Sequence, residues 1–130
     1  MIVLDTSAAI DWMLQTPTGQ HIAHRIFSRG ETVHTVHVLD LEFVQVLRRM
    51  VREKALTASR AEEAIDDLSS VRMVRYAPSQ LLMRIWQLRG NLTAYDAAYV
   101  ALAEELKAPL ITRDRRIAAA PGHKAAVEVF

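Results

Sequence analysis

Two acidic residues stand close after short apolar runs that have the composition of buried strands. Asp5 follows Ile2–Leu4 in the segment "IVLDTSAAI", and Asp114 comes two residues after "PLIT". Burying a carboxylate is costly, so these positions call for an explanation. One explanation is structural, because Asp5 or Thr6 can cap the helix that starts next. The other is chemical, and it places a charge where a rigid strand ends and solvent begins.

Two further acids lie on predicted helices. Asp96, in "LTAYDAAYVALAEE", falls in a first helical turn and on the packed face. The spacing Thr93-x-x-Asp96 also matches a capping box, in which the acid only binds a backbone N–H. Glu42, in "HVLDLEFVQVLRRM", borders the apolar stripe of its helix, so a solvated surface role is the alternative there. Asp40 starts the same helix and is expected to cap it.

Strands and helices are predicted to alternate along the chain. Strands are expected at 1–5, 31–36, 71–77, 109–112 and 127–130. Helices are expected at 7–14, 17–30, 38–55, 57–70, 78–90 and 93–108. This alternation predicts an α/β fold: a three-layer α/β/α sandwich around a central parallel sheet of four or five strands, in a single domain over residues 1–130.

A parallel sheet gives the four acids a common place. Such sheets carry their sites in the crevice beyond the carboxyl ends of the strands, and all four acids are expected to point into it. Two carboxylates about 4 Å apart repel each other by about 4 kcal/mol at an effective dielectric constant of about 20. Protons or cations must relieve that repulsion, and a set of oxygen ligands favours Mg²⁺ or Mn²⁺.

The composition narrows the class of protein. The chain has 130 residues, a net charge of only +1 and no cysteine, which excludes a global basic field, disulfides and thiolate metal sites. No basic N-terminal region precedes an apolar segment, and no apolar run approaches the roughly 18 residues of a membrane span. A cytoplasmic protein is therefore expected.

Four segments resemble the motifs of a known family. In chain order they are "IVLDTSA", "HVLDLEFVQVLRR", "LTAYDAAYVALAEEL" and "PLITRDRRI". They are similar to the four motifs of PIN-domain ribonucleases, above all the VapC-type toxins of type II toxin–antitoxin systems. One departure is His37-Val38-Leu39, where many relatives have a proline. The resemblance implies an endoribonuclease that depends on Mg²⁺ or Mn²⁺.

The resemblance also assigns roles to residues. The implied acidic set is Asp5, Glu42, Asp96 and Asp114, and the implied supporting hydroxyls are Thr6, Ser7 and Thr112. We expect Asp5 and Asp96 to bind metal directly. Glu42 and Asp114 are then expected to bind metal through water, to activate the attacking water or to hold a second ion.

The resemblance further implies three partners: an RNA substrate, a second copy of the chain in a homodimer, and a cognate antitoxin. An arginine of the antitoxin is expected to enter the acidic crevice. An apolar helix of the antitoxin is expected to dock beside residues 7–14, with Trp12 or Met13 facing its groove.

Arginines near the predicted crevice are candidates for RNA contacts. Those around Asp114 are expected to grip phosphates beside the cut bond, with a solvated loop as the alternative: Arg113, Arg115 and Arg116. Weaker candidates lie on the polar side of the Glu42 helix: Arg48, Arg49 and Arg52.

Other functions stay open at this point. A receiver-like signalling domain also has an acidic magnesium pocket, but it needs an acidic pair after the first strand and a late lysine. Here Thr6 follows Asp5, and "PLITRD" contains no lysine. A non-catalytic PIN-fold module and a housekeeping PIN nuclease are the remaining alternatives.

Overall fold

A parallel sheet of five strands forms the centre of the protein. The computed structural model describes all 130 residues and orders the strands β3-β2-β1-β4-β5. The strands are β1 (Ile2–Leu4), β2 (Val33–Val36), β3 (Met73–Tyr76), β4 (Leu110–Thr112) and β5 (Val127–Val129). All neighbouring strands run parallel, and Val3 pairs with His34 on one side and Leu110 on the other. The predicted sheet is confirmed.

The composition of each strand follows from its position in the sheet. Every residue of the three central strands β1, β2 and β4 is buried. Because helices cover both faces of a parallel sheet, β1 is wholly apolar and β4 is apolar up to Thr112. The two buried polar residues of β2, His34 and Thr35, are hydrogen-bonded to Tyr76 and to the Leu4 carbonyl. The edge strands β3 and β5 are only partly buried. The polar groups that follow the central strands are therefore the first ones available at the sheet edge.

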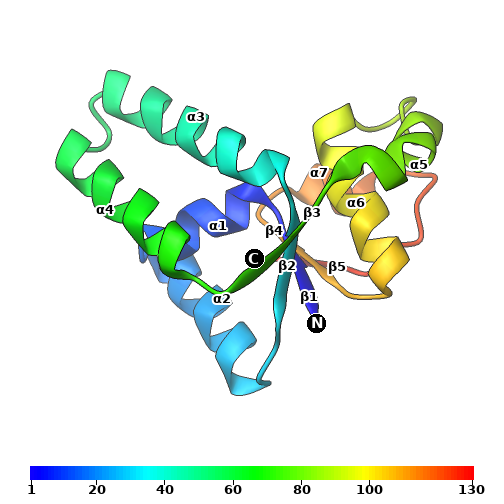
Figure 1. Cartoon of the computed structure of the whole chain (residues 1–130), viewed down its shortest axis with the longest axis horizontal. Helices are drawn as coiled ribbons and strands as arrows, with labels where there is room; N and C mark the ends of the chain where they lie inside the picture. Colours follow the sequence, from blue (N-terminus) through cyan, green and yellow to red (C-terminus); the bar gives the residue numbers. More distant parts are fainter.

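Helices form a layer on each face of the sheet. They are α1 (Thr6–Met13), α2 (Pro17–Ser28), α3 (Val38–Arg52), α4 (Ala58–Ser70), α5 (Leu82–Gln87), α6 (Ala94–Leu106) and α7 (Arg115–Ala119). Figure 1 shows α1 to α4 on one side and α5 to α7 on the other, with α3 and α4 projecting as a hairpin. This is the predicted three-layer sandwich. None of these helices combines the length and apolar character that crossing a membrane requires.

Two segments fold differently from the prediction. The helix expected over 78–90 is divided into a 3₁₀ turn, η1 (Pro78–Leu81), and α5, which ends at Gln87. The segment after β4 contains the short helix α7, which Asp114 caps by accepting a hydrogen bond from the Arg116 N–H at 2.9 Å. Helical periodicity cannot identify elements this short, because they span fewer than two turns.

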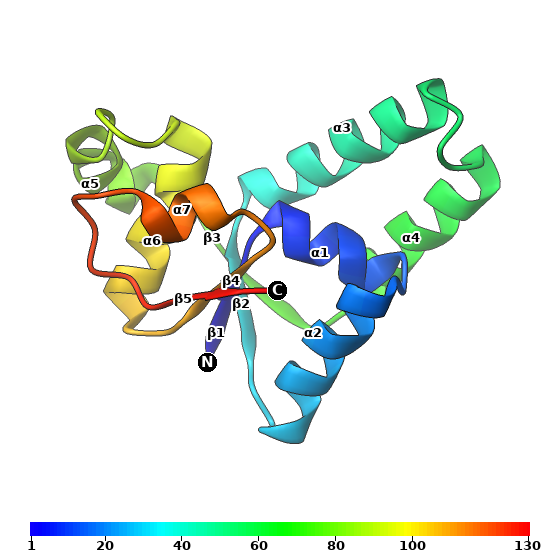
Figure 2. The same cartoon turned by 180° about the vertical axis from the view of Figure 1, so that it is seen from behind.

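The carboxyl ends of the central strands and the start of several helices meet at one edge of the sheet. Asp5 joins β1 to α1, and His37 joins β2 to α3. The helix that precedes β4, α6, runs back toward the start of that strand, so its first turn lies at this same edge in both views (Figures 1 and 2). The topology thus gathers segments that are far apart in the sequence.

Candidate active site

Asp5 is a buried carboxylate at the junction of β1 and α1, where only 5 % of the residue is exposed. Its Oδ1 accepts hydrogen bonds from Ser7 Oγ at 2.7 Å and from the Ala8 N–H at 2.9 Å, and its Oδ2 accepts one from Thr112 Oγ1. Burial raises the pKa of the Asp5 carboxyl, while these three hydrogen bonds oppose the rise and the charge of Asp96 adds to it. Asp5 therefore does cap α1, and its carboxylate lies at the edge of the sheet where β1 ends.

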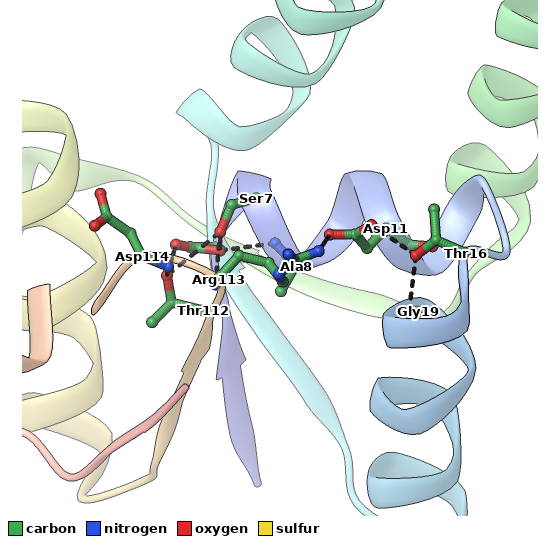
Figure 3. Close-up of polar contacts among 9 residues, drawn as sticks. Ser7, Ala8, Asp11, Thr16, Gly19, Thr112, Arg113 and Asp114 are labelled. Carbon is green, nitrogen blue, oxygen red and sulfur yellow. Dashed lines mark hydrogen bonds and ion pairs between the residues drawn. The ribbon is translucent and has the colours of Figure 1, made fainter. Parts of the chain in front are cut away.

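Hydroxyl groups tie the end of β4 to α1. Thr112 Oγ1 lies 3.3 Å from Ser7 Oγ and accepts a hydrogen bond from the Asp114 N–H at 2.9 Å. Ser7 Oγ also accepts from the Arg113 N–H at 2.9 Å. In Figure 3 the side chains of Ser7 and Thr112 meet, and Arg113 runs along α1 to an ion pair with Asp11. These contacts fix the β4–α7 turn relative to Asp5.

Glu42 reaches the sheet edge from α3 and is held through one oxygen. Its Oε1 accepts hydrogen bonds from Thr6 Oγ1 at 3.0 Å and from the Tyr99 hydroxyl at 2.6 Å, and the two hydroxyls lie 2.8 Å apart. Burial, together with the hydrogen bond to Glu42, raises the pKa of Tyr99 far above its ordinary value, so its hydroxyl stays protonated as a donor. Oε2 of Glu42 makes no hydrogen bond within the chain.

The start of α3 is anchored by an ion pair rather than by a side-chain cap. His37 occupies the N-cap position and makes no side-chain cap hydrogen bond. Asp40, which the sequence suggests as a cap, instead binds Arg75 of β3 at 2.9 Å (Nε to Oδ2) and 3.0 Å (Nη2 to Oδ1). The capping prediction for Asp40 is therefore wrong. The ion pair fixes the helix that carries Glu42 to the sheet.

Asp96 lies in the first turn of α6 and takes part in only half of the predicted capping box. Thr93 is the N-cap, and its Oγ1 accepts from the Asp96 N–H at 3.2 Å. The return hydrogen bond, from the Thr93 N–H to the Asp96 carboxylate, is absent. Burial raises the pKa of the Asp96 carboxyl, the Thr93 hydroxyl opposes this, and the charges of Asp114 and Glu42 raise it further.

Two of the arginines expected to grip phosphates are already paired with acids. Arg116 binds Asp114 through Nε at 3.0 Å and Nη2 at 2.8 Å, and this hydrogen bonding lowers the pKa of Asp114. The guanidinium of Arg113 is paired with Asp11. Arg115 is exposed and lies outside the pocket described next.

One pocket brings the four predicted acids together. Its volume is about 360 Å³, and its lining includes Asp5, Glu42, Asp96 and Asp114. Thr6 and Ser7 also line it, whereas Thr112 is fully buried behind Asp5. Larger hollows of about 520, 610 and 680 Å³ each have a single acidic side chain in their lining. The acid-rich pocket is therefore the candidate active site on chemical grounds rather than on size.

The donor set of this pocket suits a hard divalent cation. Its acids offer only oxygen ligands, which Mg²⁺ and Mn²⁺ prefer. No three Asp, Glu or His side chains are arranged to hold a metal ion directly. Mg²⁺ is commonly bound through one or two carboxylates, with water completing its shell. Burial, and after it the charges of neighbouring acids, disfavours the ionised forms of Asp5 and Asp96. These two carboxylates therefore fit that smaller requirement.

Comparison with known proteins identifies the family. The family model described as PIN domain matches residues 2–122. The chain belongs to the PIN-domain family. It is 40 % identical over 129 residues to Ribonuclease VapC12 of Mycobacterium tuberculosis, a match that covers 99 % of this chain and 98 % of that protein. The resemblance to VapC-type PIN proteins is thereby confirmed, and the receiver-like alternative is excluded.

Solved structures have the same PIN fold. PAE2754 from Pyrobaculum aerophilum superposes with a TM-score of 0.72 at 26 % identity, covering 98 % of this chain and 83 % of the other. VapBC2 from Rickettsia felis, solved bound to a DNA fragment from its promoter, gives a TM-score of 0.71 at 14 % identity, covering 99 % and 98 %.

Asp11 and Tyr99 line the pocket although the sequence gave little reason to place them there, and Arg49, one of the weaker candidates for RNA contact, lines it too. Asp11 lies in the second turn of α1, Tyr99 has the sequence character of a core aromatic, and Arg49 is one of three similar arginines on α3. Helical spacing could have indicated both Asp11 and Tyr99. Asp11 lies four residues after Ser7 and Tyr99 lies three after Asp96, so each shares a helix face with a predicted site residue.

The capping and repulsion interpretations of Asp96 make opposite predictions for Asp96→Asn. Its folded-state pKa lies above the ordinary value of 3.8, so the fold favours the protonated form. The contribution of Asp96 to the stability of the metal-free wild type should therefore fall as pH rises from that value through the raised pKa. Asp96→Asn removes this loss, so it should match the wild type at low pH and exceed it at neutral pH in urea unfolding with EDTA present.

Asp66→Asn is the matched control, because Asp66 is exposed on α4 and lies outside the pocket. Its difference from the wild type should not follow this pH profile. A neutral-pH loss of about 0.5–2 kcal/mol in Asp96→Asn would instead support the capping interpretation.

Proposed function

We propose that this PIN domain is a metal-dependent endoribonuclease. The observation that carries the proposal is the convergence of acids from four separate segments on one pocket, with Asp5 buried among them. The match to Ribonuclease VapC12 covers 98 % of that protein, and the name of that relative supports RNA as the substrate. A non-catalytic PIN module would have no need of such a costly cluster of like charges.

The surroundings of each acid indicate its role in binding the cation. Asp5 and Asp96 bind the cation directly, because burial and repulsion make their ionised forms the ones that gain most from positive charge. Asp114 assists through water and remains ionised beside Arg116. When bound, the cation supplies Lewis-acid stabilisation of phosphate charge and eases the ionisation of a nearby water.

Glu42 is suited to orient the attacking water and take its proton. Thr6 and Tyr99 occupy Oε1, so Oε2 is the oxygen open to the pocket. As the proton moves to Glu42, the water oxygen bonds to phosphorus and the bond to the 3′-oxygen breaks. The leaving 3′-oxygen takes up a proton from solvent, which yields a 5′-phosphate and a 3′-hydroxyl, and Glu42 later returns its proton to solvent. The ribose 2′-hydroxyl takes no part.

Cleavage of single-stranded RNA should therefore require Mg²⁺ or Mn²⁺ and leave 5′-phosphate and 3′-hydroxyl ends. End-group analysis of the products, with and without excess EDTA, measures both properties. Sequencing the 5′ ends of the fragments from the same reaction identifies the preferred sites. Full activity in EDTA, or 2′,3′-cyclic phosphate ends, would contradict the proposed chemistry.

We further propose that the protein is the toxin of a toxin–antitoxin pair, as the VapC resemblance implies. The acid-rich pocket is open to an arginine of a partner, which would pair with Asp5, Asp96 or Asp114 in place of the metal. A second hollow, of about 520 Å³, lies between α1, α2 and the end of α4. Trp12 and Met13 line it, but Met13 is only 3 % exposed and packs in the core, so Trp12 is the residue of the two that is open to a partner. Phe27 is 70 % exposed beside it, with its ring 6.0 Å from that of Trp12. This hollow suits an apolar helix of the antitoxin.

The homodimer that the resemblance implies would need a second apolar surface. The start of α3 and of α6 offers one, with Leu41 76 % exposed, Tyr95 58 % and Val44 48 %. These residues line a shallow hollow that also includes Glu42. A dimer formed there would place each active site beside the partner subunit.

Expression of the chain should arrest bacterial growth, and co-expression with the protein encoded by the neighbouring gene should relieve the arrest and give a stable complex. Asp5→Asn should cause no arrest yet still bind the neighbour, because the apolar hollow is untouched. If the neighbour forms no complex and leaves arrest unchanged while the pure protein still cleaves RNA, a housekeeping PIN nuclease becomes the better account.

A further inference from the structure

Only one arginine in the pocket has a free guanidinium. The pocket lining contains two arginines, Arg49 and Arg113. The guanidinium of Arg113 is engaged by Asp11, and Arg116 at the rim is engaged by Asp114. Arg49 makes neither an ion pair nor a side-chain hydrogen bond, although five acidic side chains line the same pocket: Asp5, Asp11, Glu42, Asp96 and Asp114.

The position of Arg49 on α3 explains why it faces the pocket. Glu42, Val46 and Arg49 are spaced by four and then three residues, which places them on one face of the helix. All three line the pocket, so this face of α3 forms one wall. Arg48 and Arg52 are also exposed and unpaired but do not line it. Arg49 thus differs from Arg48 and Arg52 in that it faces the pocket, whereas its charge is the same.

An RNA strand needs positive charge at this place. A phosphodiester carries a negative charge, and the carboxylates of the pocket repel it. Recruiting Arg113 or Arg116 would break an existing ion pair and expose another negative charge, so neither is a low-cost phosphate ligand. A guanidinium with no partner gives up no ion pair on binding, and its planar donors match two phosphate oxygens.

We infer that Arg49 binds a phosphate of the RNA in the active-site pocket, at or beside the phosphate that is cut. The inference rests on the proposed ribonuclease function. The contact is to the backbone, so it contributes to affinity and to the placement of the strand but carries no sequence preference. Arg49 is in this sense a substrate-binding residue that acts on every RNA alike.

Arg49→Ala tests the inference, with Arg48→Ala as the control of equal charge on the same helix. The first measurement is KM and kcat for cleavage of a single-stranded RNA at several salt concentrations. Arg49→Ala should raise KM about tenfold, the effect of losing one charge-assisted hydrogen bond. It should also reduce the slope of log affinity against log salt by about 0.7, the value for one phosphate of a single strand. Arg49→Lys should restore the slope but only part of the affinity.

The second measurement is fluorescence anisotropy of a short labelled RNA with Ca²⁺ replacing Mg²⁺, which reports binding apart from cleavage. Arg49→Ala should bind more weakly, and Arg48→Ala should bind like the wild type. If the wild type cleaves RNA and Arg49→Ala behaves like Arg48→Ala, or loses kcat with KM unchanged, the inference fails and the proposed function stands. If the wild type neither binds nor cleaves RNA, both fail.

Discussion

The buried carboxylate of Asp5 is the constraint on which the rest of the site depends. A charge that is 5 % exposed at the end of the central strand must find donors, and the chain supplies them from two segments. Ser7 and Ala8 come from the first turn of α1, and Thr112 comes from the neighbouring strand β4. Satisfying one carboxylate therefore locks the α1 start to the β4 end. Those donors offset only part of the cost of burial, because the pKa of Asp5 is still raised.

The remaining charges are arranged in two different ways around that centre. Asp11 and Asp114 are neutralised by arginines of the β4–α7 segment, so their charge is balanced within the chain. Asp5, Glu42 and Asp96 have no basic partner within ion-pair distance. The chain thus balances the rim of the pocket and leaves its centre negative. That division is what a site needs if the balancing charge at the centre is to come from a bound cation.

Sequence reasoning succeeded where a rule of topology or periodicity applied. The sheet followed from alternating strands and helices, and the meeting of Asp5 and Asp114 followed from parallel strands ending at one edge. The capping half-box at Thr93 was visible in the spacing. Its missing return bond was not, because the conformation of the Asp96 side chain depends on residues of other segments. Likewise, no local pattern reveals that Arg116 turns back onto Asp114, or that Arg49 alone of three similar arginines faces the pocket.

The most direct test of the central claim is a calorimetric titration of Mn²⁺ into the metal-free protein, with Asp5→Asn and Asp66→Asn beside the wild type. The acidic pocket as a cation site predicts that the wild type and Asp66→Asn bind Mn²⁺ alike and that Asp5→Asn binds at least tenfold more weakly, a loss of about 1.4 kcal/mol. Equal binding by Asp5→Asn and the wild type, or no binding by the wild type, would contradict it.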